Sequence, residues 1–307
     1  METSSHKSKF VKVNGINLHY LDWGGNGTVL LFLAGMGSSA YIYNEFAPRF
    51  TDKFRVIALT RRGHGDSDYP TTGYDVDTLT EDVRQFMDAL EIDKTILVGH
   101  SMANVEQCHF AALYPERILK LVFLDAAMDR SSAAFKNMVA KNPLGKIEVP
   151  GANDDHYSFE DYVASVKNYP VFAPVWCKVM EEDLLHAVKK SPDGRIVDRM
   201  SHNIGSALRV TLRSYIPEDS KIQAPVLSFY AIDSAGDYPS DYMTEEQKAL
   251  VIEYFDKVRP PLQQELIEQF RRSVPHARIV EIPNGHHICF IKNEELVFDE
   301  MRKFLLS

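Results

Sequence analysis

Short apolar runs alternate with amphipathic stretches along most of the chain. The runs contain four to seven residues, are rich in β-branched and aliphatic side chains, and predict buried strands at Val29–Leu33, Phe54–Leu59, Thr95–Val98, Leu119–Leu124, Pro225–Ala231 and Ala277–Ile282. Apolar residues at helical spacing between the runs predict helices at Val76–Leu90, Met102–Tyr114 and Glu294–Leu306. Strands that alternate with helices favour right-handed crossovers, so the sequence predicts an α/β fold with a mostly parallel central sheet flanked by helices.

The alternation has an additional hairpin at its start and an interruption in its middle. Phe10–Val13 and Leu18–Trp23 flank Asn14-Gly15, a dipeptide that favours tight turns between antiparallel strands. Residues 129–217 contain helical stretches without a convincing buried strand. We therefore expect one core built from residues 1–128 and 218–307, with residues 129–217 inserted between its strands.

Composition and charge narrow the class of protein. The chain has 307 residues, a formal net charge of −9 and 45% hydrophobic residues. The acidic balance argues against nucleic acid and anionic membranes as partners, because both attract basic patches. No run of about 18 apolar residues predicts a membrane span, and the N-terminus lacks the apolar stretch of a secretory signal. Cys108, Cys177 and Cys289 are too few and too far apart for a disulfide framework or a metal cluster. We expect a cytoplasmic protein, monomeric or homodimeric, with a small-molecule substrate.

The strongest chemical motif follows a predicted core strand. Thr95–Val98 runs directly into the small-residue turn Gly99-His100-Ser101-Met102-Ala103 and then into a helix. A serine on such a connection projects its hydroxyl beyond the carboxyl end of the sheet, in the arrangement called a nucleophile elbow. Small neighbours are needed because the turn is strained and the helix passes close to the strand. Ser101 is therefore the candidate nucleophile, with Ala103 in place of the last glycine of the full pattern.

Two other turns supply groups that a serine nucleophile needs. Leu33-Ala34-Gly35-Met36-Gly37 follows a core strand, and the backbone amides of Met36 and Met102 are the candidate donors to an oxyanion. Asn284-Gly285-His286-His287 lies between the last strand and the last helix. Imidazole titrates in the range suited to a general base, so either His286 or His287 is the candidate base.

Together these motifs resemble those of the α/β-hydrolase superfamily, in its serine-nucleophile, cap-containing, esterase-like branch. The matching pieces are Val98-Gly-His-Ser101-Met-Ala, the Ala34-Gly35 loop, Arg62-Gly-His-Gly-Asp-Ser67, Tyr114-Pro-Glu-Arg117 and His286-His287. The resemblance covers essentially the whole chain. It places residues 129–217 in the position of the helical cap.

The resemblance also orders the two candidate bases. In relatives, an apolar stretch separates the catalytic histidine from a polar residue at the start of the last helix, and this spacing favours His287 over its alternative, His286. Ala34 stands where relatives often have a histidine, and Asn104 replaces a second glycine after the elbow. Both departures concern the shape of the substrate site more than the mechanism.

The acid of a catalytic triad has several candidates. Asp125 ends an earlier core strand and is preferred, because some branches of the superfamily place their acid at that strand end. Asp233 is the alternative acid, with Asp237 as a third candidate. These two residues flank the commoner site after a later strand, where Ser234 occupies the expected position.

The resemblance implies a serine hydrolase that cleaves a small, largely apolar ester, lactone or related acyl compound through an acyl-enzyme, with no metal and no organic cofactor. Ser101 argues against typical epoxide hydrolase or haloalkane dehalogenase chemistry, because those relatives use a carboxylate nucleophile. Other members of the fold are small-molecule receptors with slow turnover, or cofactor-free oxygenases or C–C hydrolases. These functions remain alternatives.

Some remaining features have mainly structural interpretations. Arg61-Arg62-Gly63-His64-Gly65 is expected to form a structural turn, with an anion clamp as the alternative. Glu106 is expected to be a carboxylate on a helix surface, with a buried polar anchor near the site as the alternative. Thr244–Val274 predicts a long polar helical stretch that breaks at Pro260-Pro261. Trp176 either lines an apolar pocket or belongs to a small core within the insertion.

Overall fold

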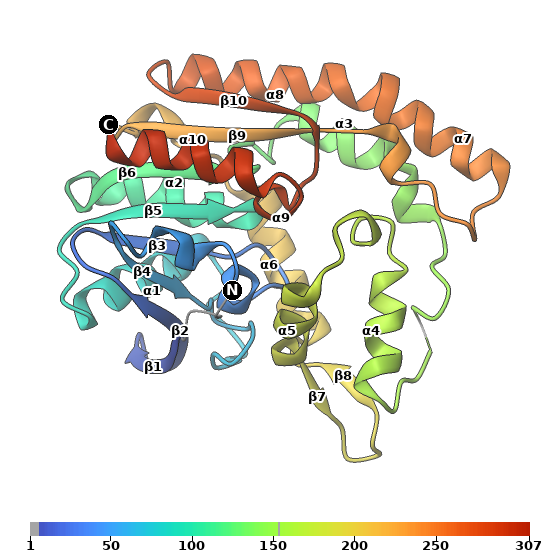
Figure 1. Ribbon diagram of the computed structural model, residues 1–307, viewed down its shortest axis with the longest axis horizontal. Helices are drawn as coiled ribbons and strands as arrows, with labels where there is room; N and C mark the ends of the chain where they lie inside the picture. Colours follow the sequence, from blue (N-terminus) through green and yellow to red (C-terminus); the bar gives the residue numbers. More distant parts are fainter. Residues whose placement is uncertain (1–5, 153) are drawn as a thin grey trace.

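The computed structural model describes residues 6–152 and 154–307. Residues 1–5, which belong to the segment expected to carry no secretory signal, lie outside the described residues. The described chain forms an eight-stranded sheet with the strand order β1-β2-β4-β3-β5-β6-β9-β10 (Figure 1). Its strands are β1 (Lys7–Val13), β2 (Ile16–Gly24), β3 (Val29–Leu33), β4 (Arg55–Leu59), β5 (Thr95–His100), β6 (Ile118–Leu124), β9 (Val226–Asp233) and β10 (Arg278–Gly285).

The sheet is antiparallel at one edge and parallel elsewhere. β1 pairs with β2 and β2 with β4 in antiparallel register, whereas the pairs from β4 to β10 are parallel. The predicted hairpin turn is present, with Asn14 at φ 48° and Gly15 at φ 80°. Every residue of β3 is buried, as expected for a central strand covered on both faces. The predicted α/β fold with a mostly parallel sheet is therefore confirmed.

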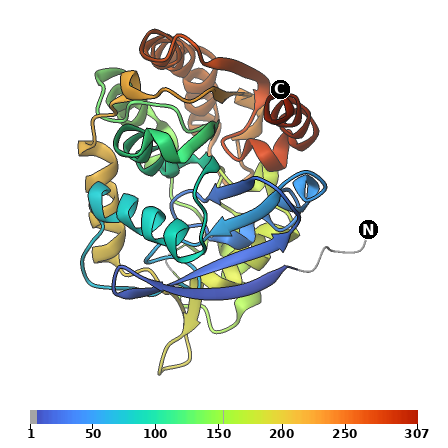
Figure 2. The same ribbon diagram turned by 90° about the vertical axis from the view of Figure 1, so that its left-hand side faces the viewer.

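Helices cover both faces of this sheet (Figure 2). On one face, α1 (Val76–Ala89), α2 (Asn104–Leu113) and α8 (Arg259–Ser273) contribute to one continuous apolar cluster with the strands. On the other face, the strands pack against α10 (Glu294–Leu306) and the short helical turn Ala40–Tyr43. These two layers hold the carboxyl ends of the parallel strands at one edge of the sheet, where the site described below lies.

Residues 129–217 lie within the connection between β6 and β9. They contain α3 (Ala133–Lys141), α4 (Phe159–Lys167), α5 (Lys178–Ala187), the hairpin of β7 (Val188–Lys190) and β8 (Ile196–Asp198), and α6 (His202–Ser214). Within the described residues, neither strand of this hairpin joins the central sheet. In Figure 1, α4, α5 and the hairpin lie beyond the carboxyl ends of the central strands.

The long helical stretch after β9 differs from its prediction. The chain runs from α7 (Glu245–Glu253) through a π-helical turn at Tyr254–Val258 directly into α8. The break predicted at Pro260-Pro261 is wrong, because both prolines lie in the first turn of α8. Proline is tolerated in the first turn of an α-helix. The last helical segments are α9 (Cys289–Lys292) and α10.

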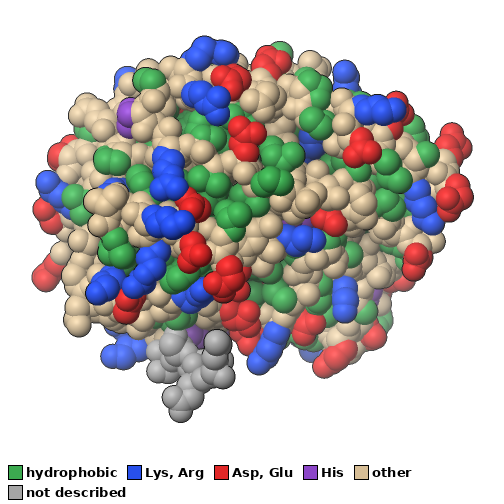
Figure 3. All heavy atoms as spheres, turned by 45° about the horizontal axis from the view of Figure 1, so that its top comes forward, with side chains coloured by type: hydrophobic (Ala, Val, Ile, Leu, Met, Phe, Trp, Pro, Cys, Tyr) green, Lys and Arg blue, Asp and Glu red, His purple; other side chains and the backbone are tan. Residues whose placement is uncertain are grey.

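Charged side chains of both signs are interspersed over the face shown in Figure 3. Exposed ion pairs also occur, and in one of them the Arg302 Nη2 lies 2.6 Å from the Asp52 Oδ2. Among the described residues, no helix combines the length and the apolar character needed to cross a bilayer.

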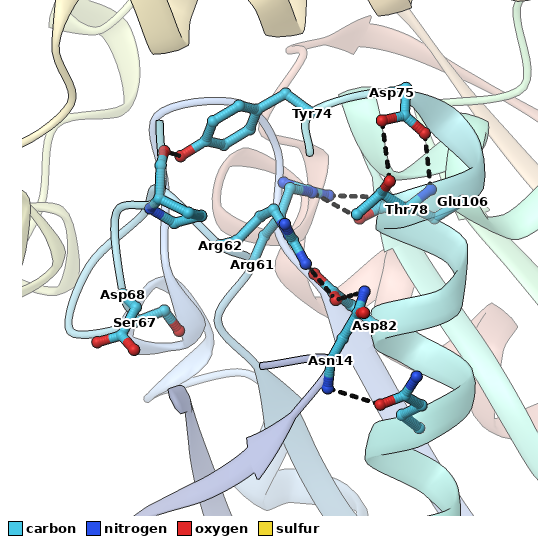
Figure 4. A network of polar contacts seen from close by, with 12 residues as sticks. Asn14, Arg61, Arg62, Ser67, Asp68, Tyr74, Asp75, Thr78, Asp82 and Glu106 are labelled. Atoms are coloured by element: carbon cyan, nitrogen blue, oxygen red, sulfur yellow. Dashed lines mark hydrogen bonds and ion pairs between the residues drawn. The ribbon is translucent and has the colours of Figure 1, made fainter. Parts of the chain in front are cut away.

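Two arginines of the turn after β4 form buried ion pairs (Figure 4). The Arg61 Nε lies 2.6 Å from Glu106 Oε1, and the Arg62 Nε lies 2.5 Å from Asp82 Oδ2. Arg61 also donates to the carbonyl oxygen of Ala34, at 3.0 Å, and so connects this pair to the loop after β3. The pairs agree with a structural role for the turn.

The prediction that Glu106 lies on a helix surface is wrong. Its side chain is 2% exposed. Burial raises the pKa of the Glu106 carboxyl, and the positive charge of Arg61 opposes that rise. Glu106 can be buried on α2 because Arg61, which follows the end of β4, supplies the opposite charge.

We expect Arg61→Met to lower the free energy of unfolding by about 3–5 kcal/mol, because the Glu106 carboxylate is then buried without its counter-charge. Urea denaturation at neutral pH measures this loss. Arg302→Met, which removes an exposed pair with Asp52, serves as the control and is expected to cost less than about 1 kcal/mol. Equal losses in the two variants would contradict a stabilising role for the buried pair.

Candidate active site

Ser101 follows the last residue of β5 and begins the short helical turn that leads into α2. Its φ is 52°, a left-handed conformation that is uncommon for a residue with a side chain. Close packing around this turn leaves no space for a Cβ at Gly35 or Gly99. A Cβ on Gly35 would lie 3.2 Å from the Ser101 Cβ, and a Cβ on Gly99 would lie 2.8 Å from the Ala103 Cβ. The small residues of both motifs are thus required by close packing around a strained turn.

His287 connects Ser101 to Asp125, although the three residues are far apart in the sequence. The His287 Nε2 lies 2.8 Å from the Ser101 Oγ, and the His287 Nδ1 lies 2.7 Å from the Asp125 Oδ2. Both distances are those of hydrogen bonds. A proton on Nδ1 leaves Nε2 free to accept the proton of the serine hydroxyl. This is the arrangement of a nucleophile, a base and an orienting acid.

Asp125 follows β6 in a left-handed conformation, with φ 47°. Its side chain is fully buried, and its Oδ1 accepts a hydrogen bond of 2.9 Å from the Ala231 amide. Burial alone would raise the pKa of this carboxyl. The hydrogen bond and charge of His287, together with the Ala231 amide, outweigh burial and hold the pKa of Asp125 below its usual value. Asp125 is therefore a buried carboxylate at neutral pH.

The two other candidate acids lie elsewhere. Asp233, at the end of β9, lies 2.6 Å from the Arg259 Nη2 and accepts a hydrogen bond from the Tyr238 hydroxyl. Asp237 lies 3.3 Å from the Lys292 Nζ. Among the described hydrogen bonds, neither carboxyl contacts His287. The structure thus brings Asp125, but not Asp233 or Asp237, to the imidazole.

His286 points to different partners from its neighbour. The Ile288 amide donates to the His286 Nδ1 at 3.0 Å, so the ring proton lies on Nε2, which is 2.9 Å from the Val171 carbonyl oxygen. Burial lowers the pKa of His286 to about 4, and the ring is neutral at pH 7. His286 thereby ties the turn after β10 to the inserted segment.

His100, which the sequence analysis did not single out, contacts the same turn. Its Nε2 lies 2.9 Å from the His287 carbonyl oxygen. Burial lowers the pKa of His100 to about 3, so this neutral ring donates to that carbonyl. His100 and His286 therefore hold the backbone around His287 from two sides. The position of His100 directly before Ser101 was the sequence signal for this role.

The candidate oxyanion donors flank Ser101. Gly35 and Met36 line the same cavity as Ser101, and no described residue accepts a hydrogen bond from the Met36 amide. Met102 directly follows the serine, and its side chain is buried. The loop that carries Met36 thus borders the same cavity as Ser101, and the role of the two amides as oxyanion donors stays a prediction.

A cavity of about 450 Å³ opens over this constellation. Its polar floor includes Ser101 and His287, and apolar side chains from residues 129–217 form much of its wall, among them Val166, Phe172, Trp176 and Met180. Trp176 therefore lines a pocket, which was one of its two interpretations. A cavity of this size and lining suits a small, largely apolar molecule.

Asp183 is a second functional candidate that the sequence analysis missed. It lies on α5, lines the cavity and is buried. Its Oδ1 accepts hydrogen bonds from both the amide and the hydroxyl of Ser39, with the amide nitrogen at 2.9 Å. Burial raises the pKa of Asp183 to about 6, and the Ser39 hydrogen bonds oppose that rise. Asp183 attaches α5 to the chain just after the Gly35–Gly37 loop.

The raised pKa of Asp183 predicts a pH-dependent contribution to stability. A carboxyl whose pKa rises from 3.8 in the unfolded chain to about 6 in the fold destabilises the protein progressively as the pH rises through that window. Asp183→Asn keeps an acceptor for Ser39 but does not titrate. We expect the stability of this variant relative to the parent protein to increase by about 2–3 kcal/mol between pH 4 and pH 7.

Urea denaturation at several pH values measures this difference. Asp52→Asn, at an exposed carboxyl, is the control and is expected to show no comparable gain. A constant difference between Asp183→Asn and the parent protein across the window would contradict the raised pKa.

Comparison with known proteins gives a family match and several partial relatives. A family model described as "alpha/beta hydrolase fold" matches residues 28–293. The chain is 33% identical over 118 residues to epoxide hydrolase 1 of Caenorhabditis elegans, covering 38% of this chain and 29% of that protein. It is 35% identical over 101 residues to 2-(acetamidomethylene)succinate hydrolase of Mesorhizobium japonicum, covering 33% of this chain and 36% of that protein. The matched segments thus span only 29% and 36% of these relatives' lengths.

Solved structures resemble the whole chain. The crystal structure of E-2-(acetamidomethylene)succinate hydrolase aligns with a TM-score of 0.77 at 19% identity, over 99% of this chain and 100% of that one. The enol-lactonase from Burkholderia xenovorans aligns with a TM-score of 0.61 at 18% identity, over 97% of this chain and 100% of that one. Likeness at such low identity establishes the shared fold.

Proposed function

The chain belongs to the α/β-hydrolase family, and on that basis we propose that it is a serine hydrolase that cleaves a small, largely apolar ester, lactone or related acyl compound. One observation carries the proposal. His287 lies between Ser101 and Asp125, at hydrogen-bond distances of 2.8 Å from the Ser101 Oγ and 2.7 Å from the Asp125 Oδ2, and a cavity with an apolar wall lies over Ser101.

The proposed reaction proceeds through an acyl-enzyme. The Ser101 Oγ attacks the acyl carbon while the His287 Nε2 takes the hydroxyl proton, and the buried Asp125 carboxylate stabilises the imidazolium that forms. The amides of Met36 and Met102 donate to the oxyanion of the tetrahedral intermediate, a contribution worth about 3–4 kcal/mol per donor in comparable sites. His287 then passes the proton to the leaving group. A water molecule, activated by the same imidazole, releases the acyl group and restores Ser101.

The inserted residues have a supporting role in this proposal. Residues 129–217 supply apolar side chains to the wall over Ser101, so we assign them the role of a cap that excludes water and selects the acyl group. The relatives include proteins named epoxide hydrolase and non-heme chloroperoxidase. An alcohol nucleophile paired with a histidine favours acyl transfer for this chain.

Ser101→Ala is expected to lower kcat for p-nitrophenyl butyrate at least about 10³-fold, because the variant lacks the nucleophile. A fluorophosphonate probe is expected to label the parent protein and not the variant. Ser220→Ala, at an exposed serine, is the matched control and should retain both activity and labelling. Activity near the parent level in Ser101→Ala would reject the mechanism. A single covalent turnover without further hydrolysis would instead support a receptor.

The two candidate acids are expected to differ sharply. Asp125→Asn preserves shape but no longer stabilises the imidazolium, so kcat for p-nitrophenyl butyrate should fall about 10³- to 10⁴-fold. Asp233→Asn should change the same kcat less than about tenfold, because Asp233 pairs with Arg259 instead of His287. Steady-state kinetics of both variants, with circular dichroism as a check of folding, make the comparison. The reverse order would assign the acid role to Asp233.

A further inference from the structure

A second cluster of polar side chains borders the cavity, separate from Ser101, His287 and Asp125. It consists of Asp233, Tyr238 and Arg259. The Arg259 Nη2 lies 2.6 Å from the Asp233 Oδ2, and the Tyr238 hydroxyl donates to the other carboxyl oxygen. The Asp233 side chain is only 1% exposed, whereas that of Arg259 is 16% exposed. The carboxylate is thus sealed, and the guanidinium forms the part of the group that reaches the cavity.

The surrounding backbone holds this group rigidly. Arg259 is the first residue of α8 and directly follows the π-helical turn, an element that occurs frequently at functional sites. The Phe255 ring of that turn stacks on the Tyr238 ring, with centroids 3.9 Å apart and an angle of 9° between the planes. The Arg259 guanidinium lies 5.4 Å from the centre of the Phe255 ring. Aromatic packing therefore fixes the direction of the arginine.

Arg259 retains unused hydrogen-bond donors. A guanidinium has five N–H groups, and the contact of Nη2 with Asp233 is an ion pair at 2.6 Å. The Nε is buried and has no hydrogen-bond partner among the described residues, and no described residue accepts a hydrogen bond from Nη1. Unused donors on a buried cation are costly unless a ligand or water accepts from them. The Nε has no accessible surface, so Nη1 is the donor that an acceptor group on a molecule bound in the cavity can reach.

The charges around the cavity determine which acceptor fits. Asp233 neutralises Arg259, and Asp183 adds a further buried carboxyl to the lining of the same cavity. An anionic ligand would therefore face two carboxyls for one arginine. A neutral acceptor, such as a carbonyl oxygen, gains the hydrogen bond of the guanidinium without that repulsion.

We propose that Arg259 binds a neutral carbonyl oxygen on the acyl part of the substrate, and that Asp233 and Tyr238 act as positioning residues for the guanidinium. The proposal rests on the function proposed above and narrows its substrate class. The preferred substrates are esters or lactones whose mainly apolar acyl chain carries a second, uncharged carbonyl group. Their apolar part lies along the wall formed by Phe172 and Trp176.

Matched acyl chains test the proposal. The p-nitrophenyl esters of 4-oxopentanoic, 5-oxohexanoic and 6-oxoheptanoic acid are compared with those of pentanoic, hexanoic and heptanoic acid. In at least one pair we expect kcat/KM of the oxo ester to exceed that of the plain ester about tenfold, the usual value of a hydrogen bond to a charged donor. The mono-p-nitrophenyl ester of glutaric acid, which carries a carboxylate, is expected to be a poorer substrate than either.

Two variants remove the guanidinium donors of Arg259, one keeping the positive charge and one removing it together with the charge of Asp233. Arg259→Lys keeps a cation for Asp233 but withdraws the forked donors, and the double variant Arg259→Met with Asp233→Asn leaves no buried charge unpaired. In both we expect the ratio of oxo to plain ester to fall about tenfold relative to the parent protein. Arg271→Met, at a partly exposed arginine of the same helix, should leave the ratio unchanged.

The outcomes separate this inference from the proposed function. An unchanged ratio in folded Arg259→Lys, or a preference of the parent protein for the carboxylate ester, would overturn the carbonyl subsite even with full esterase activity. If the parent protein hydrolyses none of the esters, the proposed function fails. Calorimetric titration of the methyl esters of the same acids into Ser101→Ala then still decides the subsite. Tighter binding of the oxo ester, lost on adding Arg259→Lys, supports it, and equal binding overturns it.

Discussion

The parallel pairing of β5 with β6 is the constraint on which the site depends. In this register His100 lies opposite Leu124, so the next residue of each strand, Ser101 and Asp125, leaves the sheet at the same level. Both residues then adopt left-handed backbone conformations, with φ 52° and 47°. A slip of one residue in this pairing would turn one of the two side chains to the opposite face of the sheet. The distance between Ser101 and Asp125 is thus set by backbone hydrogen bonds and not by the side chains themselves.

The rest of the structure supports this edge of the sheet. β9 pairs with β6 and supplies the Ala231 amide to Asp125, and β10 pairs with β9 and delivers the turn that carries His287. Strain of about 1–3 kcal/mol at each left-handed residue is tolerated only where the surroundings over-determine the conformation. The surroundings do over-determine it here, because Ser101 and Asp125 follow β5 and β6, two buried strands that are each hydrogen-bonded to a neighbouring strand on both sides.

Local features were predictable from the sequence, and long-range pairings were not. The strands, the hairpin at Asn14-Gly15 and the position of Ser101 follow from patterns within about ten residues, which neighbouring side chains alone can dictate. The choice between Asp125 and Asp233 depends on which strand end faces the imidazole. The different roles of His286 and His287 also depend on distant residues, because the Nε2 of His286 donates to the Val171 carbonyl, 115 positions away in the chain. The burial of Glu106 depends on Arg61, 45 positions away, and no local pattern contains that information.

The hydrogen bond between His286 and the Val171 carbonyl also bears on how the protein can diverge. It makes the backbone at one point of residues 129–217 a neighbour of the histidine next to the catalytic candidate, so a change of loop length there displaces His287 as well. The β7–β8 hairpin pairs only with itself among the described strands. Insertions at its tip leave the triad geometry untouched. Changes of length are therefore tolerated at the hairpin, which lies outside the lining of the cavity, while the root near Val171, which lines it, is held to a fixed length.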